Sequence, residues 1–168
     1  CEMDERVFAG IAERYAARLY TVAYRLLRNR ADAEDAVQRA LLNCFAARAA
    51  YSPRWAVSTW LYRVLTNVCV DELRRRQHRA APAAVEAAEG RSALGSVGAE
   101  ARLAAERVDL ARALERVPRE ARILLALHYV NGLSHRELAS IRGISVNTVK
   151  SQLARGKKIL RTALDKEN

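Results

Sequence analysis

The 168-residue sequence has few of the residues that interrupt or cross-link a chain. It contains only three prolines and seven glycines, and apolar residues recur at intervals of three and four along most of its length, which predicts an all-α fold. Its three cysteines, Cys1, Cys44 and Cys69, form no CxxC pair, and its three histidines have no cysteine partner at zinc-binding spacing. We therefore expect free thiols in a reducing compartment and no structural metal.

Long apolar runs and catalytic motifs are also missing. No stretch approaches the 18 residues that a membrane-spanning helix needs, and no secretory signal opens the chain, so we expect no membrane insertion and a cytoplasmic location. The sequence has no phosphate-cradling glycine loop and no evident nucleophile–base pair. These absences predict a protein that is not an enzyme and that needs no cofactor.

Positive charge is what the sequence has in excess. The formal net charge is +10, which favours a polyanionic partner. Residues 1–80 hold 14 Lys/Arg against 9 Asp/Glu and residues 106–168 hold 13 against 7, whereas residues 81–105 hold 2 against 3. The middle segment is rich in alanine, glycine and serine, a composition typical of a flexible linker. We predict two small helical domains, 1–80 and 106–168, joined by the linker 81–105.

Residues 133–160 have the pattern of a helix-turn-helix. Ser134 and Glu137 form a capping box that starts a first helix, Gly143 supplies the turn, and Ser145 caps a second helix. Apolar residues at helical spacing would bury one face of the second helix: Val146, Val149, Leu153 and Leu160. The opposite face would present polar and cationic side chains to a major groove of DNA: Asn147, Thr148, Lys150, Ser151, Arg155 and Lys158. The alternative is a helical hairpin with a solvated basic face.

Aromatic and arginine residues are interleaved between residues 45 and 76. The members of this aromatic–arginine cluster are Phe45, Tyr51, Trp55, Trp60 and Tyr62, with Arg54, Arg63, Arg74, Arg75 and Arg76. Such a mixture suits a surface that stacks unpaired bases and holds phosphates, and Asn67 could read the edge of a base. Core packing is the alternative. It is favoured for Trp60, whereas the loop position of Tyr51 and the polar character of Asn67 favour a surface role.

Two blocks of the sequence resemble the bacterial sigma-70 family. Region 2 of these factors is similar to RNRADAEDAVQRALLNCF followed by STWLYRVLTNVCVDELRRR, and region 4 is similar to VPREARILLALHYVNGLSHRELASIRGISVNTVKSQLARGKKIL. No counterpart of the third domain of larger sigma factors lies between the blocks. This architecture resembles the extracytoplasmic-function (ECF) subfamily, and the resemblance spans residues 8–165.

The resemblance implies a factor that binds core RNA polymerase and directs it to the −35 and −10 promoter elements. Contact with a coiled coil of the largest polymerase subunit is implied for Asp32, Glu34, Asp35 and Gln38. Recognition and melting of the −10 element is implied for Tyr51, Arg54, Trp55, Trp60, Arg63, Asn67, Arg74 and Arg75. Recognition of the −35 element is implied for Ser145, Asn147, Thr148, Lys150, Ser151, Arg155 and Lys158. The helix around residues 123–130 would help to dock on the polymerase flap, and an anti-sigma factor is a possible further partner.

Three residues carry further expectations: Asp32 from its local chemistry, and Arg142 and Trp55 because they depart from the family pattern. Asp32 should cap the helix that it begins. Arg142 stands just before the turn glycine, where the family usually has an apolar residue, so its side chain must snorkel or pack differently. Trp55 stands in the loop where a small residue is more usual.

Two other classes of protein compete with this interpretation. A helix-turn-helix repressor or response-regulator output domain, with residues 1–80 as a sensor, would explain the second basic block. The aromatic–arginine cluster disfavours it, because a protein that binds only duplex DNA has no use for a stacking surface. A nucleic-acid enzyme such as a deaminase or nuclease is disfavoured because the sequence lacks metal-ligand spacing.

Overall fold

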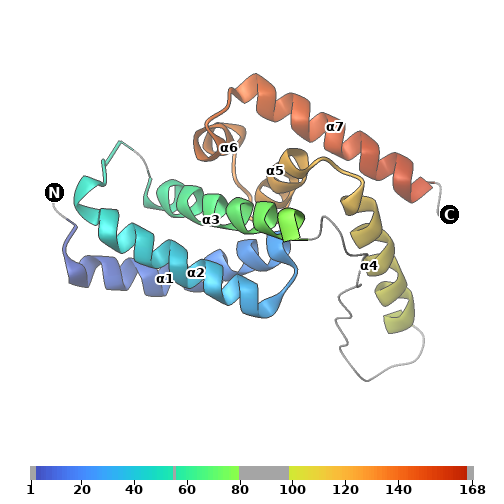
Figure 1. Ribbon diagram of the computed structural model, residues 1–168. Helices are drawn as coiled ribbons and strands as arrows, with labels where there is room; N and C mark the ends of the chain where they lie inside the picture. Colours follow the sequence, from blue (N-terminus) through green and yellow to red (C-terminus); the bar gives the residue numbers. More distant parts are fainter. Residues whose placement is uncertain (1–2, 55, 80–98, 166–168) are drawn as a thin grey trace.

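The structure, a computed structural model, describes residues 3–54, 56–79 and 99–165 (Figure 1). Its first helices are α1 (Glu5–Leu27), α2 (Arg30–Ala47) and α3 (Val57–Arg79), and a 3-10 turn, η1 (Arg48–Ala50), follows α2. The helices after them are α4 (Ala99–Glu115), α5 (Arg119–Tyr129), α6 (His135–Arg142) and α7 (Val146–Asp165). Every regular element among the described residues is helical, which confirms the all-α fold class.

Two residues between α1 and α2 reverse the chain. Arg28 ends α1 in a left-handed conformation (φ 55°), and its N–H donates to the carbonyl of Tyr24 at 2.8 Å. Asn29 then starts α2, because its side-chain oxygen accepts the N–H of Asp32 at 2.9 Å. The expectation that Asp32 caps this helix is therefore wrong. Asn29 takes that place, and the Asp32 carboxylate is left for another partner.

Helices α1, α2 and α3 form the first unit of the fold. They pack pairwise against one another through the apolar side chains that recur at helical spacing. The buried members include Phe8, Leu19, Val22, Leu26, Ala33, Val37, Cys44, Leu61, Leu65 and Val68. A stripe of this kind covers one side of a helix, so the other sides of α1, α2 and α3 remain available for further contacts.

Helices α4 to α7 form the second unit. Helices α5, α6 and α7 pack together, and α4 lies against α7. Most of the predicted linker 81–105 falls on residues 80–98, which lie outside the described residues. Helix α4, however, begins at Ala99, so the end of the predicted linker is helical. The glycines of that segment stop at Gly98, and the alanines, glutamate, arginine and leucine that follow favour a helix.

The two units pack against each other rather than standing apart. Helix α6 lies on α3 and α5 lies on α1 (Figure 1), and the buried side chains of both units form one continuous hydrophobic core. At this contact Tyr62 is only 4% exposed, and Asn131 and Glu137 of the second unit are among the groups that influence its pKa. Burial raises the pKa of Tyr62 above its ordinary value. At the rim, Arg119 donates a hydrogen bond to the side chain of Gln77.

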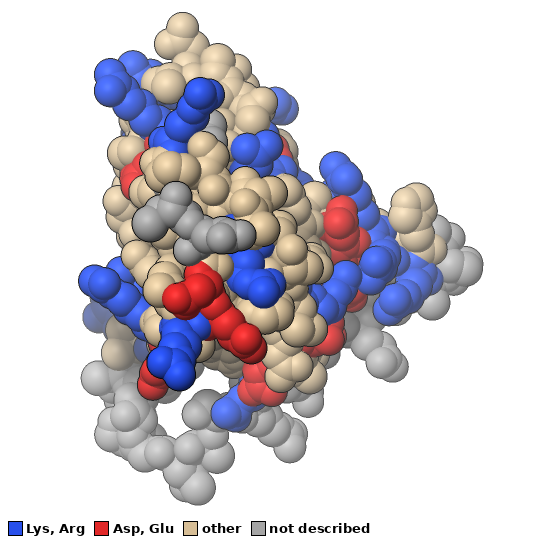
Figure 2. Space-filling model, turned by 90° about the vertical axis from the view of Figure 1, so that its left-hand side faces the viewer, with Lys and Arg blue, Asp and Glu red and all other residues tan. Residues whose placement is uncertain are grey.

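The outer surface of the protein is rich in charge of both signs. Figure 2 shows the end of the molecule near the N-terminus, where Asp and Glu side chains gather in one patch and Lys and Arg lie around it. A protein with a net charge of +10 thus has an acidic patch at this end of the molecule. None of the helices that the structure describes is long and apolar enough to cross a membrane.

Two glycines inside helices should respond in opposite ways to replacement by alanine. Gly10 on α1 is surrounded by open space, since a Cβ there would meet nothing within 4 Å. We expect Gly10→Ala to raise the free energy of unfolding by about 0.5–1 kcal/mol. A Cβ at Gly156 would lie 2.8 Å from Leu125 Cδ1 and 3.3 Å from Ala121 Cβ. Gly156→Ala should therefore lower the free energy of unfolding by about 1 kcal/mol. Chemical denaturation measures both variants. Equal stabilisation by both would contradict close α5–α7 packing.

Candidate nucleic-acid interface

The turn between α6 and α7 has the local structure that the sequence predicts. The Ser134 hydroxyl accepts the N–H of Glu137 at 3.2 Å, and the Glu137 carboxylate accepts the N–H of Ser134 at 2.7 Å, which completes the capping box. Gly143 ends α6 with φ 66°, a conformation that glycine adopts without strain. The helix-turn-helix is confirmed at the level of its caps and turn.

Helix α7 turns one face inward and presents the other to solvent. Val149, Leu153 and Gly156 are buried against the rest of the second unit. All of the side chains on α7 that were predicted to face DNA are exposed: Asn147, Thr148, Lys150, Ser151, Arg155 and Lys158. Ser145 differs from them because its hydroxyl caps the helix, accepting the N–H of Thr148 at 3.0 Å and bonding the Thr148 hydroxyl at 2.8 Å.

Arg142, a cation at a position where an apolar residue was expected, forms an ion pair with Glu120. Its Nε and Nη2 donate to the two carboxylate oxygens of Glu120 at 2.7 and 3.0 Å, so the contact joins α6 to α5 in a two-pronged geometry. The Arg142 side chain is only 11% exposed and that of Glu120 is 36% exposed. Arg142 therefore packs within the second unit, and a fixed ion pair replaces the apolar contact that the family pattern leads one to expect.

The aromatic–arginine cluster divides into separate groups in the structure. Tyr51 and Trp60 lie together with ring centroids 5.1 Å apart, and both are half-buried. Phe45 packs edge-on against Phe8 at 5.5 Å instead. Tyr62 points to the contact between the two units, and Trp55 lies outside the described residues. Among the described members of this cluster, Tyr51 and Trp60 are thus the pair that forms an aromatic surface. Trp60 is neither a fully buried core residue nor a free one.

An exposed polar stripe runs along α3 away from the second unit. Arg63, Asn67 and Arg74 are all exposed and follow one another at helical spacing, so they share one face of α3 with Trp60. Tyr62, 4% exposed, lies on a different face of the same helix. The packing of α6 on α3 therefore leaves the Arg63–Asn67–Arg74 face accessible.

The remaining predicted cations sit around this stripe. Arg75 is exposed on a neighbouring face of α3 and lies 3.9 Å from Glu72, while Arg74 lies 3.8 Å from Asp71. Arg54 is exposed in the loop that precedes α3. Contacts of this length between exposed side chains are weak, so they leave both arginines free to exchange the carboxylate for a phosphate.

The four residues implied to meet the polymerase occupy unequal environments on α2. Glu34, Asp35 and Gln38 are exposed, and the two acids lie 3.5 and 3.6 Å from Arg30 and Arg39 on their own helix. Asp32 is different: its carboxylate accepts a hydrogen bond from Arg76, which comes from the end of α3.

The sequence placed Arg76 in the aromatic–arginine cluster, but in the structure this residue links helices instead. Besides Asp32, it donates to the carbonyl of Leu27 at 2.7 Å, so one guanidinium joins the end of α1, the start of α2 and the end of α3. The sequence separations are 49 and 44 residues, and no local pattern marks a pair so far apart. In the sequence Arg76 looks like one more cation in a basic run.

Two segments of the chain match known protein families. Residues 11–79 match the family described as Sigma-70 region 2, and residues 107–160 match the family described as Sigma-70, region 4. The first match falls on α1 to α3 and the second on α4 to α7. The family boundaries therefore coincide with the two packed units of the structure.

Similarity to curated proteins extends over nearly the whole chain. The sequence is 30% identical over 169 residues to the ECF RNA polymerase sigma factor SigW of Bacillus subtilis, covering 96% of this chain and 90% of that protein. It is 33% identical to the ECF RNA polymerase sigma factor SigE of Mycolicibacterium smegmatis, covering 94% of this chain and 62% of that protein.

Two solved structures share the fold. One is CnrH in complex with the cytosolic domain of CnrY, with a TM-score of 0.72 and 24% identity over 98% of this chain and 92% of that one. The other is the sigma factor RpoE in complex with the anti-sigma factor NepR from Bartonella quintana, with a TM-score of 0.72 and 23% identity over 94% and 96%. In both, the likeness extends over nearly the whole of this chain and so takes in both helical units.

The Arg142–Glu120 pair should be coupled in a double-mutant cycle. We expect Arg142→Ala and Glu120→Ala each to lower the free energy of unfolding by about 1–3 kcal/mol, because each leaves a partly shielded charge without its partner. The double variant should lose little more than the worse single variant. Chemical denaturation of the four proteins measures this, and strictly additive losses would show that the pair contributes nothing.

Proposed function

This chain belongs to the ECF group of the sigma-70 family, and we propose how its two helical units divide the work of such a factor. As an alternative sigma factor it directs promoter-specific transcription with core RNA polymerase, and sigma factors regulate transcription rather than catalyse a reaction. We assign polymerase binding and the −10 element to residues 1–80, and the −35 element to residues 106–168. The observation that carries this assignment is the presence of one exposed, DNA-compatible face on each unit.

Helix α7 would read the −35 element in the major groove. Its exposed Asn147, Lys150 and Arg155 supply the amide and cationic groups that bind base edges, and Thr148, Ser151 and Lys158 accompany them on the same side. The capping role of Ser145 orients the first turn of α7, so Ser145 would act mainly by holding that turn at the groove.

The exposed face of α3 would capture the melted −10 strand. The Tyr51–Trp60 pair offers aromatic surface on which a base can stack. Asn67 lies on the stripe with Arg63 and Arg74, where an amide can read the edge of a base while the guanidinium groups hold phosphates. Arg54 and Arg75 would add backbone contacts at the two ends of this surface.

The exposed side of α2 would meet the polymerase coiled coil. Glu34, Asp35 and Gln38 are available for that contact. Asp32 would act through the fold instead, because its carboxylate is engaged by Arg76. It would position the start of α2 rather than touch the polymerase.

Docking on the polymerase flap would require the two units to separate. Three apolar side chains of α5, Ile123, Leu124 and Leu127, are almost fully buried at 1%, 0% and 0% exposure, whereas Tyr129 at its end is 58% exposed. Helix α5 lies on α1 as well as on α7. An anti-sigma factor that favours the packed arrangement would keep α5 covered. We propose such a protein as a further partner, in keeping with the complexes in which the two similar structures were solved.

Transcription from a promoter that the factor recognises tests the function and the −10 assignment together. Core polymerase should initiate only when the chain is added. With Tyr51→Ala/Asn67→Ala, initiation should fall at least about tenfold while the factor still co-elutes with polymerase, because a stacked base contributes roughly 1–3 kcal/mol. Tyr24→Ala, which removes an exposed ring from α1, is the control. Unchanged initiation by the double variant would remove both residues from the −10 surface.

The polymerase face can be separated from the Asp32 contact by a second set of variants. Glu34→Gln/Asp35→Asn should weaken binding to core polymerase about tenfold, equal to about 1.4 kcal/mol, without a change in stability. Asp32→Asn should lower the free energy of unfolding by about 1 kcal/mol, since it breaks a partly exposed charged hydrogen bond. Asp71→Asn on α3 controls for charge. Competition binding measures the affinity for polymerase, and denaturation measures the stability. If Asp32→Asn weakened polymerase binding and Glu34→Gln/Asp35→Asn lowered stability instead, Asp32 would be the polymerase contact and the other two residues would have the structural role.

A further inference from the structure

Helix α7 is much longer than the part that reads bases. Its 20 residues extend over about 30 Å, whereas the major groove is about 12 Å wide and winds around the duplex. A helix-turn-helix reads bases with the N-terminal part of its second helix. When Asn147 and Lys150 are at the base edges, the C-terminal half of α7 must leave the groove beside a phosphate strand.

That C-terminal half carries a strip of three cations, of which Lys158 belongs to the −35 assignment while Lys157 and Arg161 do not. Lys157, Lys158 and Arg161 are all exposed. Together with Ala154, Thr162 and Asp165 they line a shallow groove of about 540 Å³ on the surface of α7. Asp165 is the only acidic residue in α7, and it lies one turn beyond Arg161. The positive potential of the helix therefore extends without interruption from Lys150 to Arg161.

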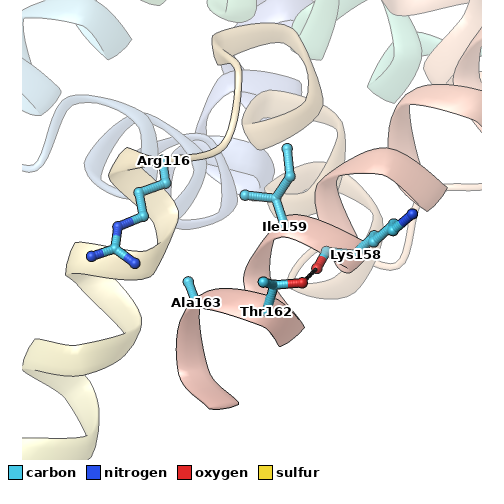
Figure 3. A pocket seen from close by; sticks show the side chains of 5 residues that line it. All are labelled: Arg116, Lys158, Ile159, Thr162 and Ala163. Atoms are coloured by element: carbon cyan, nitrogen blue, oxygen red, sulfur yellow. Dashed lines mark hydrogen bonds between the residues drawn. The ribbon is translucent and has the colours of Figure 1, made fainter. Parts of the chain in front are cut away.

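Helix α4 approaches the side of α7 that carries Ile159 and Ala163, and Lys158 and Thr162 lie at the border between that side and the strip. Figure 3 shows the hollow where α4 approaches α7, with Arg116 on one side and Ile159 and Ala163 between the helices. The Lys158 side chain points away from α4 in the same view, and the Thr162 hydroxyl bonds the Lys158 carbonyl at 3.0 Å.

The Lys157 side chain has an aromatic neighbour, Tyr129. Its ammonium lies 5.7 Å from the centre of the Tyr129 ring at the end of α5. Tyr129 is 58% exposed, so the contact orients the cation without removing it from solvent. By helical spacing Lys150, Lys157 and Arg161 lie along one edge of α7, with Lys157 and Arg161 about 15 and 21 Å along the axis from Asn147.

We propose that Lys157 and Arg161, with Lys158 between them, bind the phosphate backbone of the DNA that flanks the −35 element. This inference rests on the proposed role of α7 and extends its contact beyond the base-reading turns. The ligand is the phosphodiester backbone, so the contact fixes the angle and register of α7 and contributes affinity without sequence preference.

The salt dependence of DNA binding tests this proposal. The probes are a duplex carrying the −35 sequence selected by the wild-type holoenzyme and a scrambled duplex of equal length. For Lys157→Gln/Arg161→Gln holoenzyme, the slope of log Kobs against log salt should shrink by about 1.8, since each phosphate contact contributes about 0.9. The ratio of the wild-type to the variant binding constant should therefore grow about 12-fold when the salt concentration falls from 200 to 50 mM. The change should be the same on both duplexes.

A matched control removes the same charge elsewhere in the second unit. Arg102→Gln/Arg107→Gln lies toward the start of α4 on exposed positions, and it should leave the slope unchanged. Neutral methylphosphonates in place of the phosphates that flank the selected −35 element should lower the wild-type slope to that of the variant, with no further effect on the variant itself. Both results together would establish the phosphate contact.

Other outcomes would overturn the proposal in distinguishable ways. If the Lys157→Gln/Arg161→Gln holoenzyme kept the wild-type salt slope and transcription was intact, the phosphate contact would be refuted. The strip would then be available to an acidic protein partner. A loss confined to the selected duplex would make these residues readers of bases instead. Failure of the wild-type holoenzyme to bind the selected duplex or to initiate would overturn the proposed function, and this inference with it.

Discussion

Helix α3 has to satisfy three kinds of neighbour at once, and the rest of the structure depends on how it does so. One side packs on α1 and α2, a second receives α6, and a third stays exposed with Arg63 and Asn67. A helix with partners on two sides is apolar over much of its circumference. The polar stripe is therefore narrow in the middle of α3, where Arg63 and Asn67 are the exposed residues between Leu61 and Val70.

The features that the sequence could predict are those that depend on neighbours in the chain. The capping box at Ser134, the left-handed turn at Gly143 and the cap at Ser145 involve residues three to five positions apart, and each is present. The exposed face of α7 follows from the helical period alone. The fold class follows for the same reason, since amphipathic periodicity is a local property.

The features that could not be predicted depend on partners distant in the chain. Arg142 finds Glu120 across 22 residues, and Arg76 finds Asp32 across 44. Asp32 was expected at the helix cap because aspartate is common there, but Asn29 takes that place. The aromatic–arginine cluster was divided by tertiary packing, which sends Phe45 and Tyr62 to different contacts than Tyr51 and Trp60. Composition shows that such side chains are present, but only the packing decides which of them share a surface.

The two cysteines that the structure describes, Cys44 and Cys69, are free thiols that are almost completely shielded from solvent. Burial raises the pKa of each to about 12. At neutral pH only about one such thiol in 10⁵ is ionised, and the thiolate is the form that oxidants and electrophiles attack. Neither Cys44 nor Cys69 is suited to sense peroxide or disulfide stress. Oxidation of either of these two thiols would first require the helix packing that buries it to open.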